Sequence, residues 1–210
     1  MQNQKRIVLN DTQGKLVIDP MVGGALVDYD FKGPQGWIPI LRPGNLFQRL
    51  GPFSLGCNVL LPFANRISGG GFKTPLGQAK LSTNLVGEPF PIHGNAFQEP
   101  WQIIRVAEDE VYLTLQSEGP SRFRYSAQLR YKLEEGILSM ELDVINQAEE
   151  TLPYGIGFHP WLAREEDSRL QFNAVGCGWK IHSISPQNMW FQVLVPPAIF
   201  ARVMDSLMVC

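Results

Sequence analysis

The chain has 210 residues, which is enough for one domain with a sizeable hydrophobic core. Its formal net charge is −2, and its 18 Lys and Arg residues are not clustered. These features argue against a nucleic-acid groove and a polybasic membrane patch, so we predict neither a nucleic-acid nor a membrane partner.

The N-terminal segment MQNQKRIVLND lacks the apolar stretch of a signal peptide, and no apolar run in the chain is long enough to cross a bilayer. The three cysteines, Cys57, Cys177 and Cys210, lie far apart and form no C-x-x-C pair. This pattern argues against a disulfide framework or a zinc knuckle and favours a cytoplasmic location.

Apolar and polar residues alternate along much of the chain, which is typical of β-strands with one buried face. In chain order, the expected strands are KLVID and GALVDYDF around Gly23-Gly24, then Val111–Leu115, Phe123–Leu133 and Leu138–Val144. Glu134-Glu135-Gly136 interrupts the last two and predicts a β-hairpin. The 20 glycines and 16 prolines are spread throughout, and no amphipathic helix of three turns stands out. We therefore predict an all-β antiparallel fold, either a sandwich or a barrel.

Three segments break the alternation and carry unusual residues: Cys57–Phe72, Pro91–Trp101 and Pro153–Leu162. Loops and strand ends on a rigid sheet are common places for functional residues. In the first segment, Arg66 is either a donor to sugar hydroxyls or an internal tie between loop and sheet. The following Gly69-Gly-Gly71 favours a tight turn over a phosphate cradle, because no G-K-[ST] follows it.

The other two segments each contain a histidine. His93 lies before Gly94, which permits close approach of another chain segment or a ligand. His159 precedes Pro160, which favours an extended and rigid backbone, and an imidazole suits proton transfer near neutral pH. His182 lies in an alternating segment and is interpreted as a strand or surface residue. No His-x-x-x-His or Cys pair accompanies these histidines, so we predict no metal site.

Taken together, the three segments are more specific than any one of them. The motifs NRI-x-G-G-x-F, I-H-G…W and P-x-G-x-G-F-H-P-W follow one another on a chain that is predicted to be all β. In this order they resemble the aldose 1-epimerase (galactose mutarotase) family, and Leu-Pro-Phe-x-Asn-Arg is similar to a bacterial branch of it. The resemblance implies a galactose-mutarotase-type antiparallel β-sandwich with a sugar cleft, no metal and no organic cofactor.

Members of this family interconvert the α and β anomers of a cyclic aldose. A base removes the C1 hydroxyl proton, an acid protonates the ring oxygen, and the ring opens and closes again. The resemblance implies that His159 is the acid and that Arg66 and His93 bind and polarise the sugar. We include Asn65 and Trp161 among the predicted substrate-binding residues, with Trp161 or Phe97 presenting an apolar face to the sugar ring.

The chain departs from the family at its C-terminal end. The family's base is a glutamate in a late strand, yet no glutamate follows Glu166, and Glu165 and Glu166 lie too close to the H-P motif to match it. Met189–Cys210 shows neither sustained strand alternation nor a helical stripe. We therefore expect an epimerase-like sandwich over residues 1–190, incomplete or altered at its end, followed by an atypical apolar tail over residues 191–210.

Three functions stay open on the sequence. The first is an epimerase that acts on an aldohexose or a related sugar such as a hexose 6-phosphate. The second is a non-catalytic sugar-binding protein that lacks the base, and the third is an inactive, incomplete epimerase. In each of the first two, the partner is a small-molecule sugar. An unpaired strand edge or the apolar tail also predicts self-association.

Overall fold

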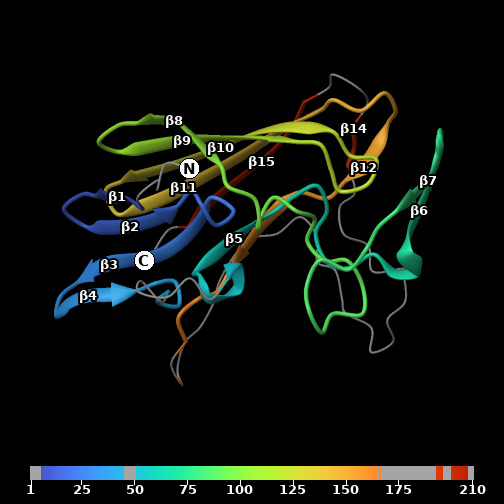
Figure 1. Cartoon of the computed structure of the whole chain (residues 1–210). Coiled ribbons are helices and arrows are strands. Elements are labelled where there is room, and N and C mark those ends of the chain that lie inside the picture. Colours follow the sequence, from blue (N-terminus) through green and yellow to red (C-terminus); the bar gives the residue numbers. More distant parts are fainter. Residues whose placement is uncertain (1–5, 45–50, 165, 167–192, 196–199, 208–210) are drawn as a thin grey trace.

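Antiparallel β-sheets make up the fold (Figure 1). The computed structural model describes residues 6–44, 51–164, 166, 193–195 and 200–207. Within these residues there is no α-helix, only two short 3-10 turns, η1 (Pro52–Ser54) and η2 (Ser68–Gly70). The predicted all-β antiparallel fold is therefore confirmed.

The first sheet has the strand order β1-β2-β3-β5-β13, with β4 paired to the outer part of β3. Its strands are β1 (Ile7–Asn10), β2 (Gly14–Asp19), β3 (Ala25–Gly33), β4 (Gly36–Pro39), β5 (Cys57–Leu60) and β13 (Gly157–Pro160). The chain thus returns from β12 to place β13, which carries the H-P motif, beside β5.

The second sheet has the order β15-β11-β10-β9-β8. Its strands are β8 (Gln102–Val106), β9 (Glu110–Ser117), β10 (Tyr125–Glu134), β11 (Ile137–Asn146) and β15 (Phe200–Leu207). Two small ribbons lie outside the large sheets: β6 (Gly71–Thr74) with β7 (Gly77–Lys80), and β12 (Leu152–Tyr154) with β14 (Val193–Val195).

The period-two pattern places the central hairpin of the second sheet as predicted. Strands β9, β10 and β11 are successive and antiparallel, and Glu134 pairs with Ile137 across a two-residue turn. Both turn residues, Glu135 and Gly136, have positive φ values of 52° and 75°. Such a turn matches the twist of the flanking strands, which explains why the alternation resumes without a shift in register.

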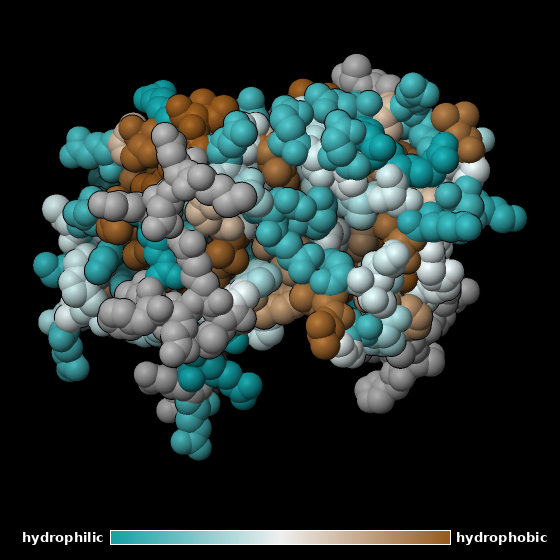
Figure 2. Space-filling view, in the orientation of Figure 1, coloured by the Kyte–Doolittle hydropathy of each residue, from teal (hydrophilic) through white to brown (hydrophobic). Residues whose placement is uncertain are grey.

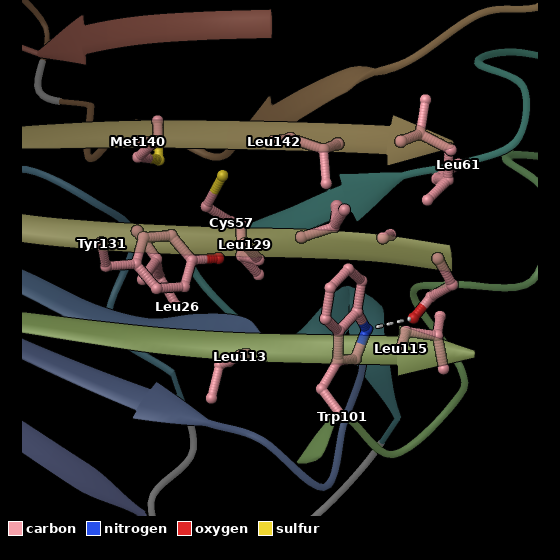
Figure 3. Close-up of a cluster of buried hydrophobic side chains, with 14 of the residues drawn as sticks. Leu26, Cys57, Leu61, Trp101, Leu113, Leu115, Leu129, Tyr131, Met140 and Leu142 are labelled. Carbon is pink, nitrogen blue, oxygen red and sulfur yellow. Dashed lines mark hydrogen bonds between the residues drawn. The ribbon is translucent and has the colours of Figure 1, made fainter. Parts of the chain in front are cut away.

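The core lies between the two large sheets. Its buried side chains come from both of them, including Leu26 and Cys57 on one side and Leu129 and Met140 on the other (Figure 3). Two buried polar groups find partners there: the Tyr131 hydroxyl donates to the Gly24 carbonyl at 2.8 Å, and Trp101 Nε1 donates to the Ala96 carbonyl at 3.0 Å. The sandwich is thus tied by polar bonds within its apolar interior.

A second polar tie joins the β10–β11 turn to the first sheet. The Tyr29 hydroxyl donates to the Gly136 carbonyl, and Asp11 Oδ2 accepts from the Gly136 N–H at 2.9 Å. Burial raises the pKa of Tyr29 to about 12, so its phenol keeps the proton that it donates. The tip of the hairpin is therefore held to the opposite sheet by both of the backbone groups of one glycine.

The C-terminal segment contains a strand that its sequence pattern did not indicate. Strand β15 pairs with β11 from Leu138↔Leu207 to Ile145↔Phe200. Every second residue of β15 is Ala201, Val203, Asp205 and Leu207, so one acidic residue interrupts an otherwise apolar series. This interruption explains why the sequence pattern concealed the strand. By backbone pairing, β15 and β8 are the outer strands of this sheet.

Apolar side chains of the described residues reach the surface in several places. Figure 2 shows small apolar patches among polar residues on the face in view. Large exposed apolar side chains lie on the edge strands β4 and β8, namely Trp37, Ile38, Ile104 and Val106. Within the residues described, no helix is long and apolar enough to span a membrane. Self-association and a cytoplasmic location stay predictions.

Leu142→Ala should lower the free energy of unfolding by about 2–5 kcal/mol, because Leu142 is fully buried between the sheets and a cavity would remain. The control is Ile145→Ala on the same strand, since Ile145 is 40% exposed and should change stability by about 0.5 kcal/mol or less. Urea unfolding of both variants measures the difference. Equal losses would contradict the assignment of the two faces of β11.

Candidate functional site

Strands β5 and β13 have one face toward the core, and their other face carries Asn58 and His159. They pair antiparallel, with Phe158 opposite Val59 and His159 opposite Asn58. Val59 is buried in the core, and Phe158 packs against that core. Because side chains alternate along a strand and directly opposed residues share a face, Asn58 and His159 lie together on the other face. The pairing therefore determines where His159 emerges.

The loop that carries His93 passes very close to the end of β5. Leu61 and Gly94 form an isolated bridge, and the Asn95 N–H donates to the Leu61 carbonyl at 3.1 Å. Gly94 has φ +71°, and a Cβ placed there would lie 2.0 Å from the Leu61 carbonyl oxygen. Only glycine meets both conditions. The close approach brings His93 to the same end of the sheet as His159.

Two hydrogen bonds join His93 to the backbone of Asn65. The His93 N–H donates to the Asn65 carbonyl at 2.9 Å, and the Asn65 N–H donates to Nδ1 of His93 at 3.0 Å. Both residues have positive φ, 59° and 61°, in a region where asparagine and histidine are enriched. Because Nδ1 accepts a hydrogen bond, the neutral His93 ring carries its proton on Nε2 and can donate from there.

The side chain of Asn84 clamps the His93 loop from outside. Its Nδ2 donates to the carbonyls of Ile92 and Gly94 at 2.8 and 2.7 Å, and its Oδ1 accepts from the Ile92 N–H at 2.9 Å. The backbone on both sides of His93 is therefore held by one amide. This clamp, together with Asn65, fixes both the position and the ring orientation of His93.

The surroundings of His93 keep its ring neutral. The residue is 8% exposed, and the rings of Phe53 and Phe97 each lie 6.2 Å from it between centroids. Burial, followed by the positive charges of His159 and Arg66, lowers the pKa of His93 to about 4, although Glu88 acts in the opposite direction. At neutral pH, His93 is therefore a hydrogen-bond donor without charge.

His159 lies beside His93 and Trp161. Its ring centroid is 5.5 Å from that of His93 and 4.9 Å from that of Trp161. Within the residues described, His159 Nδ1 is buried without a hydrogen-bond partner, whereas Nε2 is not among the buried unpartnered atoms. Nε2 makes no hydrogen bond within the same residues, so it is the ring nitrogen that reaches the surface. Nε2 is therefore the atom of His159 that can exchange a proton with a ligand.

Arg66 is held in place by Glu88. Its Nε and Nη2 donate to the two carboxylate oxygens of Glu88, both at 2.7 Å. This bidentate pairing raises the pKa of Arg66 and lowers that of Glu88. The Arg66 side chain is 39% exposed. A guanidinium has five N–H donors, so three remain for a ligand, two on Nη1 and one on Nη2.

The structure thus brings together the residues that the sequence singled out. His93 and His159 are adjacent, Arg66 is near enough to affect the His93 pKa, and Trp161 contacts the His159 ring. The Asn65 contribution seen here comes from its backbone. The roles of these five residues toward a substrate stay predictions, and His182 lies outside the described residues.

Of the two aromatic residues expected to face a sugar, the structure disfavours Phe97. Phe97 is fully buried, so it cannot present a face to a sugar and instead packs against the rings of Phe53 and His93. Trp161 is partly exposed, but the guanidinium of Arg42 lies 4.4 Å from its ring centroid. Arg42 and His159 therefore already contact the Trp161 ring, and only the rest of the ring is left for a ligand.

Three neighbours of the candidate site were missed in the sequence. Asn58 lies within the apolar run CNVLL, and Asn84 and Glu88 lie in a polar loop, so no local pattern distinguished them. Asn84 is 8 residues from its partner Ile92, and Glu88 is 22 residues from its partner Arg66. Asn58 is 101 residues from His159, the residue opposite it. In the part of the chain that the structure describes, no cluster of three or more His, Cys, Asp or Glu residues could hold a metal ion.

Comparison with known proteins gives a consistent family. The family model described as aldose 1-epimerase matches residues 5–188. The uncharacterized protein YphB of Escherichia coli K12 is 28% identical over 166 residues, covering 79% of this chain and 55% of that protein. The uncharacterized protein YihR of the same organism is 30% identical over 144 residues, covering 67% and 45%. The chain spans about half the length of these two relatives.

Solved structures share the fold. One, from Escherichia coli K12, is of a protein provisionally described as an aldose 1-epimerase; the TM-score is 0.73 at 26% identity, covering 92% of this chain and 66% of that one. A galactose mutarotase-like protein from Clostridium acetobutylicum gives a TM-score of 0.61 at 24% identity, covering 74% and 49%. The predicted galactose-mutarotase-type fold is thereby confirmed.

Gly94→Ala should destabilise the chain and displace His93, because the added Cβ would meet the Leu61 carbonyl at 2.0 Å. The control is Gly87→Ala, since Gly87 also has positive φ, +83°, but has nothing within 4 Å of an added Cβ. Both variants bear the backbone strain of about 1 kcal/mol, and only Gly94→Ala bears the clash. Urea unfolding compares them; equal losses would show that the close approach at Leu61 is not required.

The depressed pKa of His93 predicts a pH dependence of stability. The unfolded ring titrates near 6.5 and the folded ring near 4, so the unfolded state binds more protons between these values. Stability should therefore be highest above pH 6.5 and fall as the pH is lowered toward 4. In His93→Asn the amide oxygen can replace Nδ1 as acceptor from Asn65, and the slope in this window should decrease. A His93 ring that titrates near 6.5 by NMR would contradict the prediction.

Proposed function

The chain belongs to the aldose 1-epimerase family, and on this premise we propose that it binds a cyclic aldose at His93 and His159 and promotes opening of the sugar ring by proton transfer. The observation that carries the proposal is the contact between two histidines of different character. One ring, His93, is neutral and fixed, and the other, His159, exposes Nε2 at a centroid distance of 5.5 Å. Such a pair can both orient a hydroxyl-rich ligand and exchange a proton with it.

His159 is the proposed acid. Ring opening requires a proton on the ring oxygen as its bond to C1 breaks. A positioned acid accelerates such a step by about 10²–10⁴. His159 Nε2 is accessible, and the extended backbone before Pro160 is fixed by pairing with β5. The ring is thus held by a sheet rather than by a mobile loop.

His93 and Arg66 are the proposed sugar-binding groups. His93 donates from Nε2 as a neutral group, which suits a hydroxyl or ring oxygen without placing a second cation beside the protonated His159. Arg66 contributes its three unused N–H donors, and the Glu88 carboxylate keeps the guanidinium plane fixed. We assign the substrate as an aldohexose or a close relative of it.

The mechanism also needs a proton acceptor at the C1 hydroxyl. Glu88 is the carboxylate whose charge acts on His93, and both of its oxygens already accept hydrogen bonds from Arg66. With water as the base, one of the two proton transfers would lose about 10²–10⁴ in rate. This arrangement favours a second candidate function, a sugar-binding protein without appreciable catalysis.

His159→Asn should remove the catalysed part of mutarotation and keep sugar binding, because asparagine can hydrogen-bond but cannot cycle a proton near neutral pH. Polarimetry of freshly dissolved α-galactose measures the rate, and calorimetry measures binding. The surface variant Ile145→Ala is the control and should match the unchanged chain in both assays.

The outcomes separate the two candidates. A rate above buffer for the unchanged chain that falls to buffer level in His159→Asn supports the epimerase. Binding without a rate above buffer supports the sugar-binding protein. Equal rates for both chains, well above buffer, would exclude His159 as the acid, and no binding of any aldose would reject both candidates.

A further inference from the structure

Asn58 is a polar residue in a place where the sequence pattern calls for an apolar one. It is the second residue of β5, in the run CNVLL, and it is fully buried. Its neighbours Cys57 and Val59 belong to the hydrophobic core. Asn58 is on the opposite face of the strand, directly across from His159 on β13.

The carboxamide of Asn58 makes no hydrogen bond. Both Nδ2 and Oδ1 are buried, and neither has a partner among the residues described. Buried amides are normally satisfied, and each exception calls for an explanation such as a functional role. An apolar residue would fill this position without the free-energy cost of an unpaired amide. The local packing alone therefore does not account for asparagine.

The buried, unpartnered atoms around Asn58 include both hydrogen-bond donors and an acceptor. The same set of buried, unpartnered atoms contains His159 Nδ1 and Trp161 Nε1. Trp161 Nε1 can only donate. Within this set, Asn58 Oδ1 is thus the acceptor available to a proton on His159 Nδ1. Directly opposed residues in an antiparallel pair have Cβ atoms about 4.5–5.5 Å apart, which places the two side chains within reach of each other.

The chemistry proposed for His159 requires such an acceptor. A histidine that gives up its Nε2 proton near neutral pH must keep the other proton on Nδ1, because loss of both would leave an imidazolate. In water the neutral imidazole of histidine favours the opposite form, with its proton on Nε2. An acceptor beside Nδ1 stabilises the form with the proton on Nδ1 and leaves the Nε2 lone pair toward the ligand.

We propose that Asn58 is a positioning residue for His159: its Oδ1 accepts the Nδ1 proton and selects the tautomer in which Nε2 exchanges a proton with the sugar. The role rests on the proposed function of His159. To form the hydrogen bond between Asn58 Oδ1 and His159 Nδ1, the two side chains must rotate from the unpaired arrangement. The χ2 angle of asparagine has a broad distribution, which permits this rotation.

The tautomer of His159 can be measured without sugar and without turnover. The chain contains three histidines, so long-range ¹H–¹⁵N correlation spectra of a histidine-labelled sample show three ring systems. His93→Asn and His159→Asn assign them. In the unchanged chain above the His159 titration midpoint, we expect the neutral ring to carry its proton mainly on Nδ1.

Two substitutions at Asn58 test the acceptor. Asn58→Leu removes it at similar volume, and the His159 proton should move to Nε2. Asn58→Asp keeps it and adds a charge; the proton should stay on Nδ1 and the titration midpoint of His159 should rise by about one unit or more. Leu60→Val is the control, because Leu60 is buried on the same face of β5 opposite Gly157 and should leave the tautomer unchanged.

The result decides the proposal in either direction. The proposal is overturned if the neutral His159 ring of the unchanged chain carries its proton on Nε2. It is also overturned if the unchanged chain and Asn58→Leu have the same His159 tautomer. If Asn58→Leu does not fold, the unchanged chain and Asn58→Asp decide: a midpoint that fails to rise in Asn58→Asp also overturns it. Absence of mutarotase activity with the proton on Nδ1 would instead reject the catalytic proposal and leave the positioning role of Asn58 intact.

Discussion

The pairing of β5 with β13 is the constraint on which the site depends. Four consecutive residues of each strand are in register, so the alternation of the two faces is strict over this stretch. One face contributes Val59 and Phe158 to the interior, and the other carries Asn58 and His159. A shift by one residue would exchange the two faces and place an imidazole in the core. The stability of the sandwich and the position of His159 are therefore consequences of the same register.

His93 reaches the same place by a different route. It comes from a loop, and its position depends on hydrogen bonds to the backbone of Asn65, on the side-chain amide of Asn84, and on the absence of a side chain at Gly94. A loop whose backbone N–H and C=O groups are hydrogen-bonded by nearby amide groups is held rigidly, although it has no regular secondary structure. The two histidines are thus held by a sheet and by a hydrogen-bonded loop, and neither position relies on a ligand.

The sequence predicted the fold better than the site. Strands β10 and β11 were evident, because Phe123–Leu133 and Leu138–Val144 alternate and a two-residue turn separates them. Strand β15 was missed because Asp205 interrupts its apolar series. His93, His159 and Arg66 were selected as candidates through their motifs and a family resemblance. Asn58 and Glu88 were not, because a strand register and a contact across 22 residues place them beside these candidates, and neither leaves a local pattern.

The pairing of Arg66 with Glu88 has an entropic consequence. A free arginine side chain has many rotamers, and ordering it costs up to about 2 kcal/mol. Here two hydrogen bonds to one carboxylate already restrict the guanidinium before any ligand arrives. The loss of side-chain freedom therefore accompanies folding and is not repeated when a sugar binds. A weakly binding small molecule with few apolar contacts, such as a monosaccharide, gains most from a receptor side chain that is already ordered.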